Sequence, residues 1–172
     1  MLLRILLGAV LVIHAVQKTA GWLDGAGFSA TVGGFEKLGQ RPPKLMVAVA
    51  AVSETSAGVL LILGLATPIA GVVAAATMLV AGTSQSLALR KVAHWRGGGE
   101  YPLVLAGLAY ALALTGPSQL SLDNAAGGVG RWSSSLVAND SWPFIAAAVA
   151  LALATPPIAS AAHHIRDRQG MK

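Results

Sequence analysis

The sequence predicts an all-α membrane protein, built as a bundle of transmembrane helices. Of its 172 residues, 55% are hydrophobic and only 11% are charged, whereas about a quarter of the residues in an average soluble domain are charged. The apolar residues also gather into long stretches with few or no charges, and a helix needs about 20 such residues to cross a bilayer. These two observations indicate a chain that crosses the membrane several times.

Four apolar stretches give five expected helices. The stretches cover residues 5–17, 45–89, 101–122 and 141–165, and the second is long enough for two spans. Pro68 divides it, because proline lacks a backbone donor and clashes with the preceding helical turn. The expected spans are residues 2–22, 44–65, 68–89, 101–115 and 142–162. A cleaved signal peptide is the weaker alternative for the first span, because no clean small-residue cleavage site follows its apolar core.

The basic residues predict which side of the membrane each loop faces. Cytoplasmic loops carry an excess of Lys and Arg, and five spans place ten basic residues on one side but only Arg4 and Arg131 on the other. We therefore expect the N-terminus outside and the C-terminus inside. Nucleic-acid binding is not expected, because the basic residues are scattered over short loops without interleaved aromatic residues. The ten are Lys18, Lys37, Arg41, Lys44, Arg90, Lys91, Arg96, Arg166, Arg168 and Lys172.

The residue types present exclude several kinds of redox centre. The chain has no cysteine, so it has no thiolate nucleophile and no cysteine-ligated iron–sulfur cluster. Haem held by two histidines is not expected, because only His14 lies well inside a predicted span. No metal site is expected at His163 and His164 either, since adjacent residues point to different sides of a helix.

Polar residues in the second half of the first span are candidates for function. His14, Gln17 and Lys18 are three and four residues apart, so they share one face of a helix. An ionisable group in hydrocarbon is costly and usually faces a partner inside the bundle. At 1.5 Å per residue, His14 lies about 12 Å from the inner end of the first span and Glu54 about 15 Å from the inner end of the second. We therefore expect these two residues to pair.

Two further pairs are expected at other depths. Lys18 is level with Glu100, and Arg4 and Asp123 form a structural pair near the outer boundary. Structural alternatives stay open: the pair on the first two helices can simply cross-link them, Lys18 can snorkel to the interface, and Glu100 can cap its helix. No catalytic residue is assigned. The candidate cofactor-binding cluster is His14, Gln17, Lys18, Glu54 and Glu100.

Several short motifs follow one another with characteristic spacing over residues 1–123. They are Arg4 with Gly8, His14-Ala-Val-Gln-Lys18 with Gly21-Trp22, Phe35-Glu36-Lys-Leu-Gly39 before Pro42, Glu54-Thr-Ser-Ala-Gly58 running on to Gly64-Leu-Ala-Thr67, Glu100-Tyr101-Pro102, and Gly116-Pro117 before Ser121-Leu-Asp123. With these motifs the chain resembles the DoxX family of small bacterial and archaeal membrane proteins.

The resemblance implies a four-helix membrane core over residues 1–123. The chain would then add a Gly/Ser-rich external loop at 124–141, a fifth transmembrane helix at 142–162 and a basic cytoplasmic tail at 163–172. It also implies a place in the bacterial cytoplasmic membrane, in contact with lipid.

Three functions follow from this resemblance and the polar cluster. The first is an accessory or anchoring subunit of a redox complex. Such a subunit would have protein partners, and quinone is the one cofactor to consider for it. The others are a non-enzymatic scaffold and a carrier of small molecules or lipids. Whether the chain is an enzyme, and whether it forms a homo-oligomer, the sequence leaves open.

Overall fold

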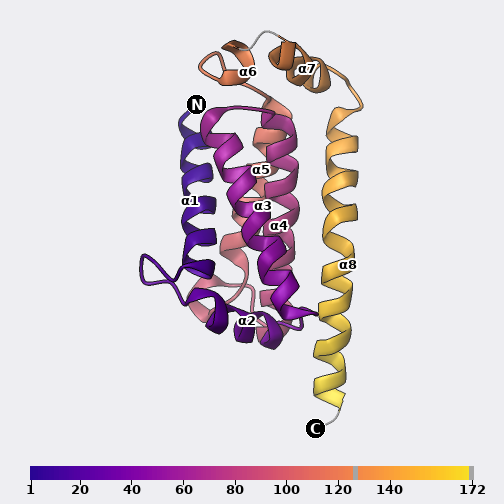
Figure 1. Ribbon diagram of the computed structural model, residues 1–172. Coiled ribbons are helices and arrows are strands. Elements are labelled where there is room, and N and C mark those ends of the chain that lie inside the picture. Colours follow the sequence, from indigo (N-terminus) through magenta and orange to yellow (C-terminus); the bar gives the residue numbers. More distant parts are fainter. Residues whose placement is uncertain (126–127, 171–172) are drawn as a thin grey trace.

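The structure, a computed structural model, is a bundle of long helices closed at both ends by short ones (Figure 1). It describes residues 1–125 and 128–170, without the side chains of residues 94, 128–130 and 169. Over these ranges all regular secondary structure is helical, which confirms the predicted fold class.

Five helices correspond to the expected spans. Four of them are long and apolar enough to cross a membrane: α1 (Leu2–Thr19), α3 (Pro43–Leu63), α4 (Thr67–Leu89) and α8 (Trp142–Gly170). The fifth, α5 (Glu100–Thr115), is apolar but shorter. Helix α1 ends three residues before its predicted end at residue 22, whereas α8 continues past residue 162 to Gly170. The far end of α8 therefore projects beyond the bundle (Figure 1).

Short helices that the sequence did not predict lie at the two ends. Helix α2 (Gly27–Lys37) and the 3-10 turn η1 (His94–Arg96) belong to the end where α1 finishes, which we call the inner end. Helices α6 (Leu122–Ala125) and α7 (Gly128–Val137) lie across the opposite end, near the N-terminus (Figure 1).

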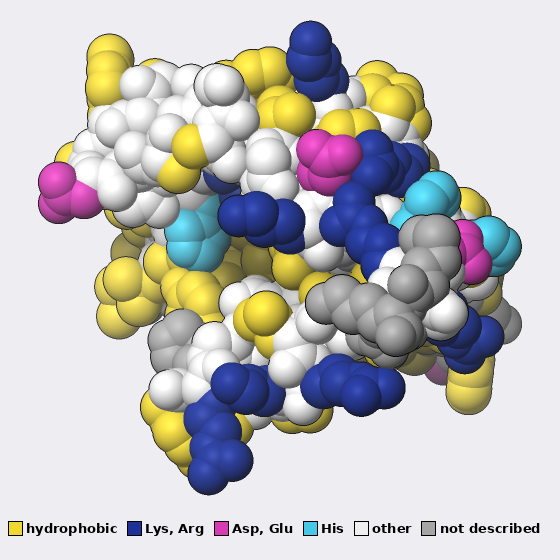
Figure 2. Space-filling model, turned by 90° about the horizontal axis from the view of Figure 1, so that it is seen from below, with side chains coloured by type: hydrophobic (Ala, Val, Ile, Leu, Met, Phe, Trp, Pro, Cys, Tyr) yellow, Lys and Arg dark blue, Asp and Glu magenta, His cyan; other side chains and the backbone are white. Residues whose placement is uncertain are grey.

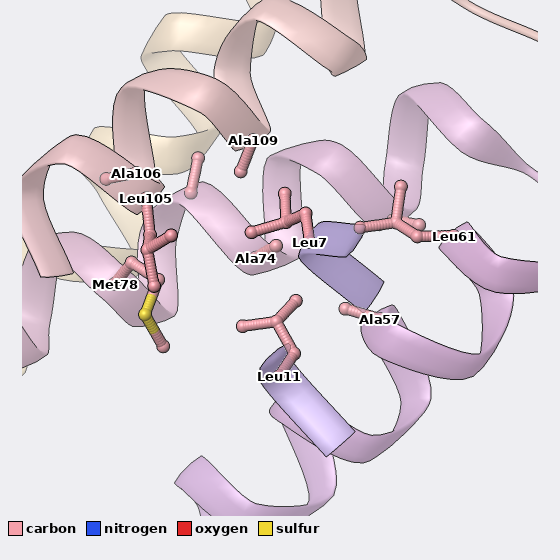
Figure 3. Close-up of a cluster of buried hydrophobic side chains, with 11 residues drawn as sticks. Leu7, Leu11, Ala57, Leu61, Ala74, Met78, Leu105, Ala106 and Ala109 are labelled. Carbon is pink, nitrogen blue, oxygen red and sulfur yellow. The ribbon is translucent and has the colours of Figure 1, made fainter. Parts of the chain in front are cut away.

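The centre of the bundle is packed with small side chains and a few large ones. Leu7 and Leu11 of α1 extend toward alanines of α3, α4 and α5, beside Met78 (Figure 3). In lipid no hydrophobic effect drives helices together, so small residues that allow close backbone approach stabilise the contact. The core residues labelled in Figure 3 are Leu7, Leu11, Ala57, Leu61, Ala74, Met78, Leu105, Ala106 and Ala109.

Two glycines set the register of α1 against α3. A methyl group on Gly8 would lie 2.6 Å from the carbonyl oxygen of Gly58, and one on Gly58 would lie 2.8 Å from the carbonyl oxygen of Gly8. Both distances are shorter than a carbon–oxygen contact allows, so the two backbones touch here. Because the helices are antiparallel, every depth along this pair can be counted from this contact.

Helix α8 packs mainly on α4 through a stripe of alanines. Trp142 anchors its outer end, where the buried indole Nε1 donates a hydrogen bond of 2.9 Å to the carbonyl oxygen of Ala113 on α5. At the inner end, Gly39 of the α2–α3 connection lies against the backbone of Ala161, because a methyl group there would be 2.6 Å from the Ala161 carbonyl oxygen. Helix α8 is therefore held at two points along its length. The buried stripe is Ala146, Ala150, Ala154 and Ala161.

Candidate functional site

A partly open cavity of about 470 Å³ lies in the inner half of the bundle. Its lining comes from α1, α2, α3, α4, α5 and α8 and is mostly apolar, with Phe35, Leu38, Met46, Met78 and Leu153 among the walls. Cavities that bind small molecules typically measure about 300–1,000 Å³ and combine apolar walls with a few placed polar groups. This cavity has both properties.

An ion pair between Lys18 and Glu54 is part of the cavity lining. The Lys18 ammonium donates to Oε1 of Glu54. The Glu54 side chain is fully buried, while 23% of the Lys18 side chain is exposed. The second carboxylate oxygen of Glu54, Oε2, is buried and accepts no hydrogen bond from the residues that the structure describes. The carboxylate is therefore only half satisfied by the protein.

The expected pairing of His14 with Glu54 is wrong, because Glu54 pairs with Lys18. His14 and Glu54 nevertheless lie at nearly the same depth, as expected. Counted from the Gly8–Gly58 contact, His14 lies six residues inward and Glu54 four, a depth difference of about 3 Å. Lys18 lies one turn closer to the inner end than His14, but its four-carbon stem is flexible, and its ammonium forms a charge-assisted bond with the carboxylate. It reaches the carboxylate in place of the imidazole.

The His14 ring instead packs against α5. Its centroid lies 5.8 Å from that of Tyr101, and the two ring planes are inclined by 79°. This edge-to-face arrangement is favourable for aromatic pairs. Both rings line the cavity beside the Lys18–Glu54 pair.

Two members of the predicted cluster lie outside the cavity. Gln17 donates through Nε2 to the carbonyl oxygen of Leu23, at 3.0 Å, and so closes the turn after α1. Glu100 stands in the first turn of α5 and does not belong to the lining. The predicted Lys18–Glu100 pair is also wrong, because Lys18 binds Glu54. The cavity thus brings together His14, Lys18 and Glu54 of the predicted five.

Arg4 and Asp123 also meet other partners than expected. Asp123 caps α4: its Oδ1 accepts from the N–H of Ala66 at 2.8 Å and its Oδ2 from that of Thr67 at 3.1 Å. The Arg4 guanidinium donates to the hydroxyl of Ser118 at 3.2 Å and to the carbonyl oxygen of Leu120 at 2.9 Å. The predicted ion pair is wrong because each charged group instead binds backbone or hydroxyl groups at the outer end. Both residues stabilise the outer end: Arg4 binds the connection after α5, and Asp123 binds the start of α4.

Some lining residues had no signal in the sequence strong enough to identify them. Gln40 donates through Nε2 to the hydroxyl of Ser84, at 2.7 Å, in a buried bond that ties the α2–α3 connection to α4. Ser84 is one small polar residue within an apolar span, and such residues are common in membrane helices. Tyr101 could have been identified from the sequence, because it follows Glu100 at the expected start of the fourth span. Phe35 and Leu38 could be placed in the lining only once α2 was known to form a helix at the inner end.

Basic side chains gather around the inner end of the molecule. Figure 2 shows Lys and Arg side chains over this face, around a recess with hydrophobic side chains in its floor. Glu36 of α2 faces Arg41 at 2.9 Å and Arg168 of α8 at 4.0 Å, which links both elements at this face. Lys172, counted among the inner basic residues, lies outside the described residues.

Comparison with known proteins identifies the family. The model of the DoxX family matches residues 1–95, which include His14, Lys18 and Glu54 but neither α5 nor α8. The protein named "Putative oxidoreductase CatD" of Bacillus subtilis (strain 168) is 32% identical over 123 residues, which cover 72% of this chain and 83% of that protein. No solved structure matches the chain. A family match over more than half of the sequence, together with this relative, shows that the chain belongs to the DoxX family of membrane proteins.

Proposed function

We propose that this chain is an accessory or anchoring subunit of a redox complex in the bacterial cytoplasmic membrane, and that its cavity binds a quinone-type ring. The cavity itself carries the proposal, because it joins apolar walls to a charged pair and two aromatic rings. The name of the Bacillus subtilis relative supports a connection with oxidoreductases. The catalytic centre would reside in a partner subunit.

The polar groups suit a flat ring with carbonyl oxygens. An ammonium group has three donors and no acceptor, and Glu54 takes one donor of Lys18. The others can bind a carbonyl oxygen at the wall of the cavity. Glu54 holds Lys18 at this depth, and His14 and Tyr101 offer flat faces and edges for an aromatic ligand.

The orientation belongs to the same proposal. With the α2 end in the cytoplasm, the basic face meets the anionic inner leaflet and any soluble partner, and the N-terminus lies outside. The polar part of the cavity is then nearer to the cytoplasmic surface, where protons and a soluble redox partner would arrive.

Ligand binding by matched variants tests the proposal. The protein is purified into nanodiscs, its bound quinones are extracted and quantified by mass spectrometry, and menadione binding is measured by equilibrium dialysis. We expect about one ring per chain, and binding weakened at least tenfold by His14→Ala or Lys18→Met. Glu36→Gln, at the basic face but outside the cavity, is the control. Equal menadione uptake by all variants would show simple partition into lipid and would refute the site.

A carrier of small amphipathic molecules is the second candidate, since the cavity is partly open and mostly apolar. The same extraction distinguishes the two functions, because a carrier of this kind would yield a lipid or another small molecule in place of a quinone.

A further inference from the structure

Helix α8 contains two adjacent prolines, Pro156 and Pro157, within its continuous helical run. In an α-helix each carbonyl oxygen accepts from the N–H four residues later, or three residues later where the turn tightens. Proline has no N–H. The carbonyl oxygen of Leu153 therefore has no donor at either position, since residue 156 and residue 157 are both proline.

Two donors in the same stretch of α8 have other acceptors. The hydroxyl of Thr155 donates to the carbonyl oxygen of Leu151 at 2.6 Å. Ile158 carries the first N–H after the prolines, and its regular acceptor is Ala154. An unsatisfied carbonyl in hydrocarbon is costly, so a donor from outside the helix would be stabilised at this oxygen.

The unsatisfied oxygen lies in the turn of α8 that lines the cavity. Leu153 and Pro157 are the two α8 residues that line the cavity, and the carbonyl of Leu153 points along the helix toward Pro157. It lies about 12 Å outward from Ala161, the α8 residue that touches Gly39 at the inner end. The neighbouring Pro156 is exposed and does not line the cavity.

We infer that the backbone carbonyl of Leu153 accepts a hydrogen bond from the ligand in this cavity, so the ligand carries a hydroxyl or similar donor. This inference rests on the proposed function and makes it more specific. A fully oxidised quinone presents acceptors only, whereas its reduced form, the quinol, carries two hydroxyl groups. One hydroxyl can donate to the Leu153 carbonyl while an oxygen of the ring accepts from Lys18. The cavity therefore prefers the quinol to the quinone.

Binding of matched ligands to matched variants tests this preference. Menadiol, its dimethyl ether and menadione are measured anaerobically by equilibrium dialysis on nanodiscs that contain the full chain. We expect the wild type to bind menadiol about three to ten times more tightly than the ether, the effect of one net hydrogen bond. Pro157→Ala restores an N–H for Leu153 and is expected to abolish this difference. Pro156→Ala supplies an N–H four residues from Ala152 and only three from Leu153, so it is the comparison variant and is expected to retain more of the difference than Pro157→Ala.

The outcomes separate the inference from the proposed function. Equal affinity of the wild type for menadiol and its ether overturns the inference while the ring-binding proposal stands, and this comparison needs no variant to fold. A preference that survives Pro157→Ala, or that both proline variants lose equally, overturns it as well. If none of the three compounds binds the wild type above the His14→Ala variant, the proposed function fails and the inference falls with it.

Discussion

Removal of the Asp123 carboxylate tests how the outer end is held. Helix α4 begins after Ala66, a residue that offers no capping side chain, so its first N–H groups are satisfied by Asp123 from 56 and 57 residues away. Asp123 is fully buried, and its own N–H donates to the carbonyl oxygen of Gly64 at 2.9 Å. Asp123→Ala leaves two helix N–H groups without this acceptor, one of them on the fully buried Thr67.

The magnitude follows from the two lost bonds. A buried donor left unsatisfied costs about 1–3 kcal/mol, and loss of an N-cap costs about 0.5–2 kcal/mol. We expect Asp123→Ala to lower the free energy of unfolding by about 2–4 kcal/mol. For a chain of this size, that corresponds to roughly 5–15 °C in the unfolding midpoint. Asp123→Asn keeps one acceptor oxygen and should lie between the wild type and the alanine variant.

The assay is thermal unfolding in detergent, followed by the fraction of protein that stays monodisperse. Asp140→Ala is the control, because Asp140 is an exposed acidic residue at the same end of the molecule. Asp123→Ala and Asp140→Ala unfolding within about 1 °C of each other would refute the capping role.

Three further expectations concern helix packing, the ion pair and topology. Gly8→Ala should lower stability, because its methyl group would lie 2.6 Å from the Gly58 oxygen. Gly107→Ala places its methyl group in open space beside α5, so it should be neutral or stabilising by up to about 1 kcal/mol. Thermal melting compares the two variants. Glu54→Leu leaves Lys18 without its partner and should cost about 3–5 kcal/mol, while adding Lys18→Met should recover most of that loss; additive effects of the two substitutions would contradict the pairing. In the cysteine-free chain, Asn124→Cys should react with an impermeant maleimide on intact cells and Lys91→Cys only after permeabilisation; the reverse pattern would invert the proposed orientation.

The sequence predicts the long helices well because lipid imposes a simple requirement on them. Hydrocarbon demands about 20 apolar residues per span, and α3 and α4 begin within one residue of the expected positions. Helix α2 was missed because its Gly, Ser and Thr residues are poor helix formers. The spacing of Phe28, Thr31, Phe35 and Leu38, which places them on one helix face, was the available signal.

Ion-pair partners were harder to predict than the depth of the charged residues. Counting residues along antiparallel helices gave the level of His14 and Glu54 correctly, since rise per residue is fixed. The choice between His14 and Lys18 depends on side-chain reach and on the direction in which each faces around α1, and neither follows from depth. The same limit explains why the partner of Asp123 was predicted wrongly. Its carboxylate accepts from backbone N–H groups, and no pattern of charges in the sequence indicates such partners.

Two carboxylates among the described residues, Asp123 and Glu54, are buried but differ in how completely they are hydrogen-bonded. Asp123 and Glu54 each have fully buried side chains. Both oxygens of Asp123 accept helix N–H groups, as expected for a structural group. Glu54 has only Lys18, although a carboxylate can accept several bonds. The other buried side-chain polar atoms without partners in the described chain are hydroxyls and one nitrogen of Arg4, whose guanidinium makes two other bonds. Glu54 is therefore a buried carboxylate that the fold leaves incompletely satisfied, and it lines the cavity.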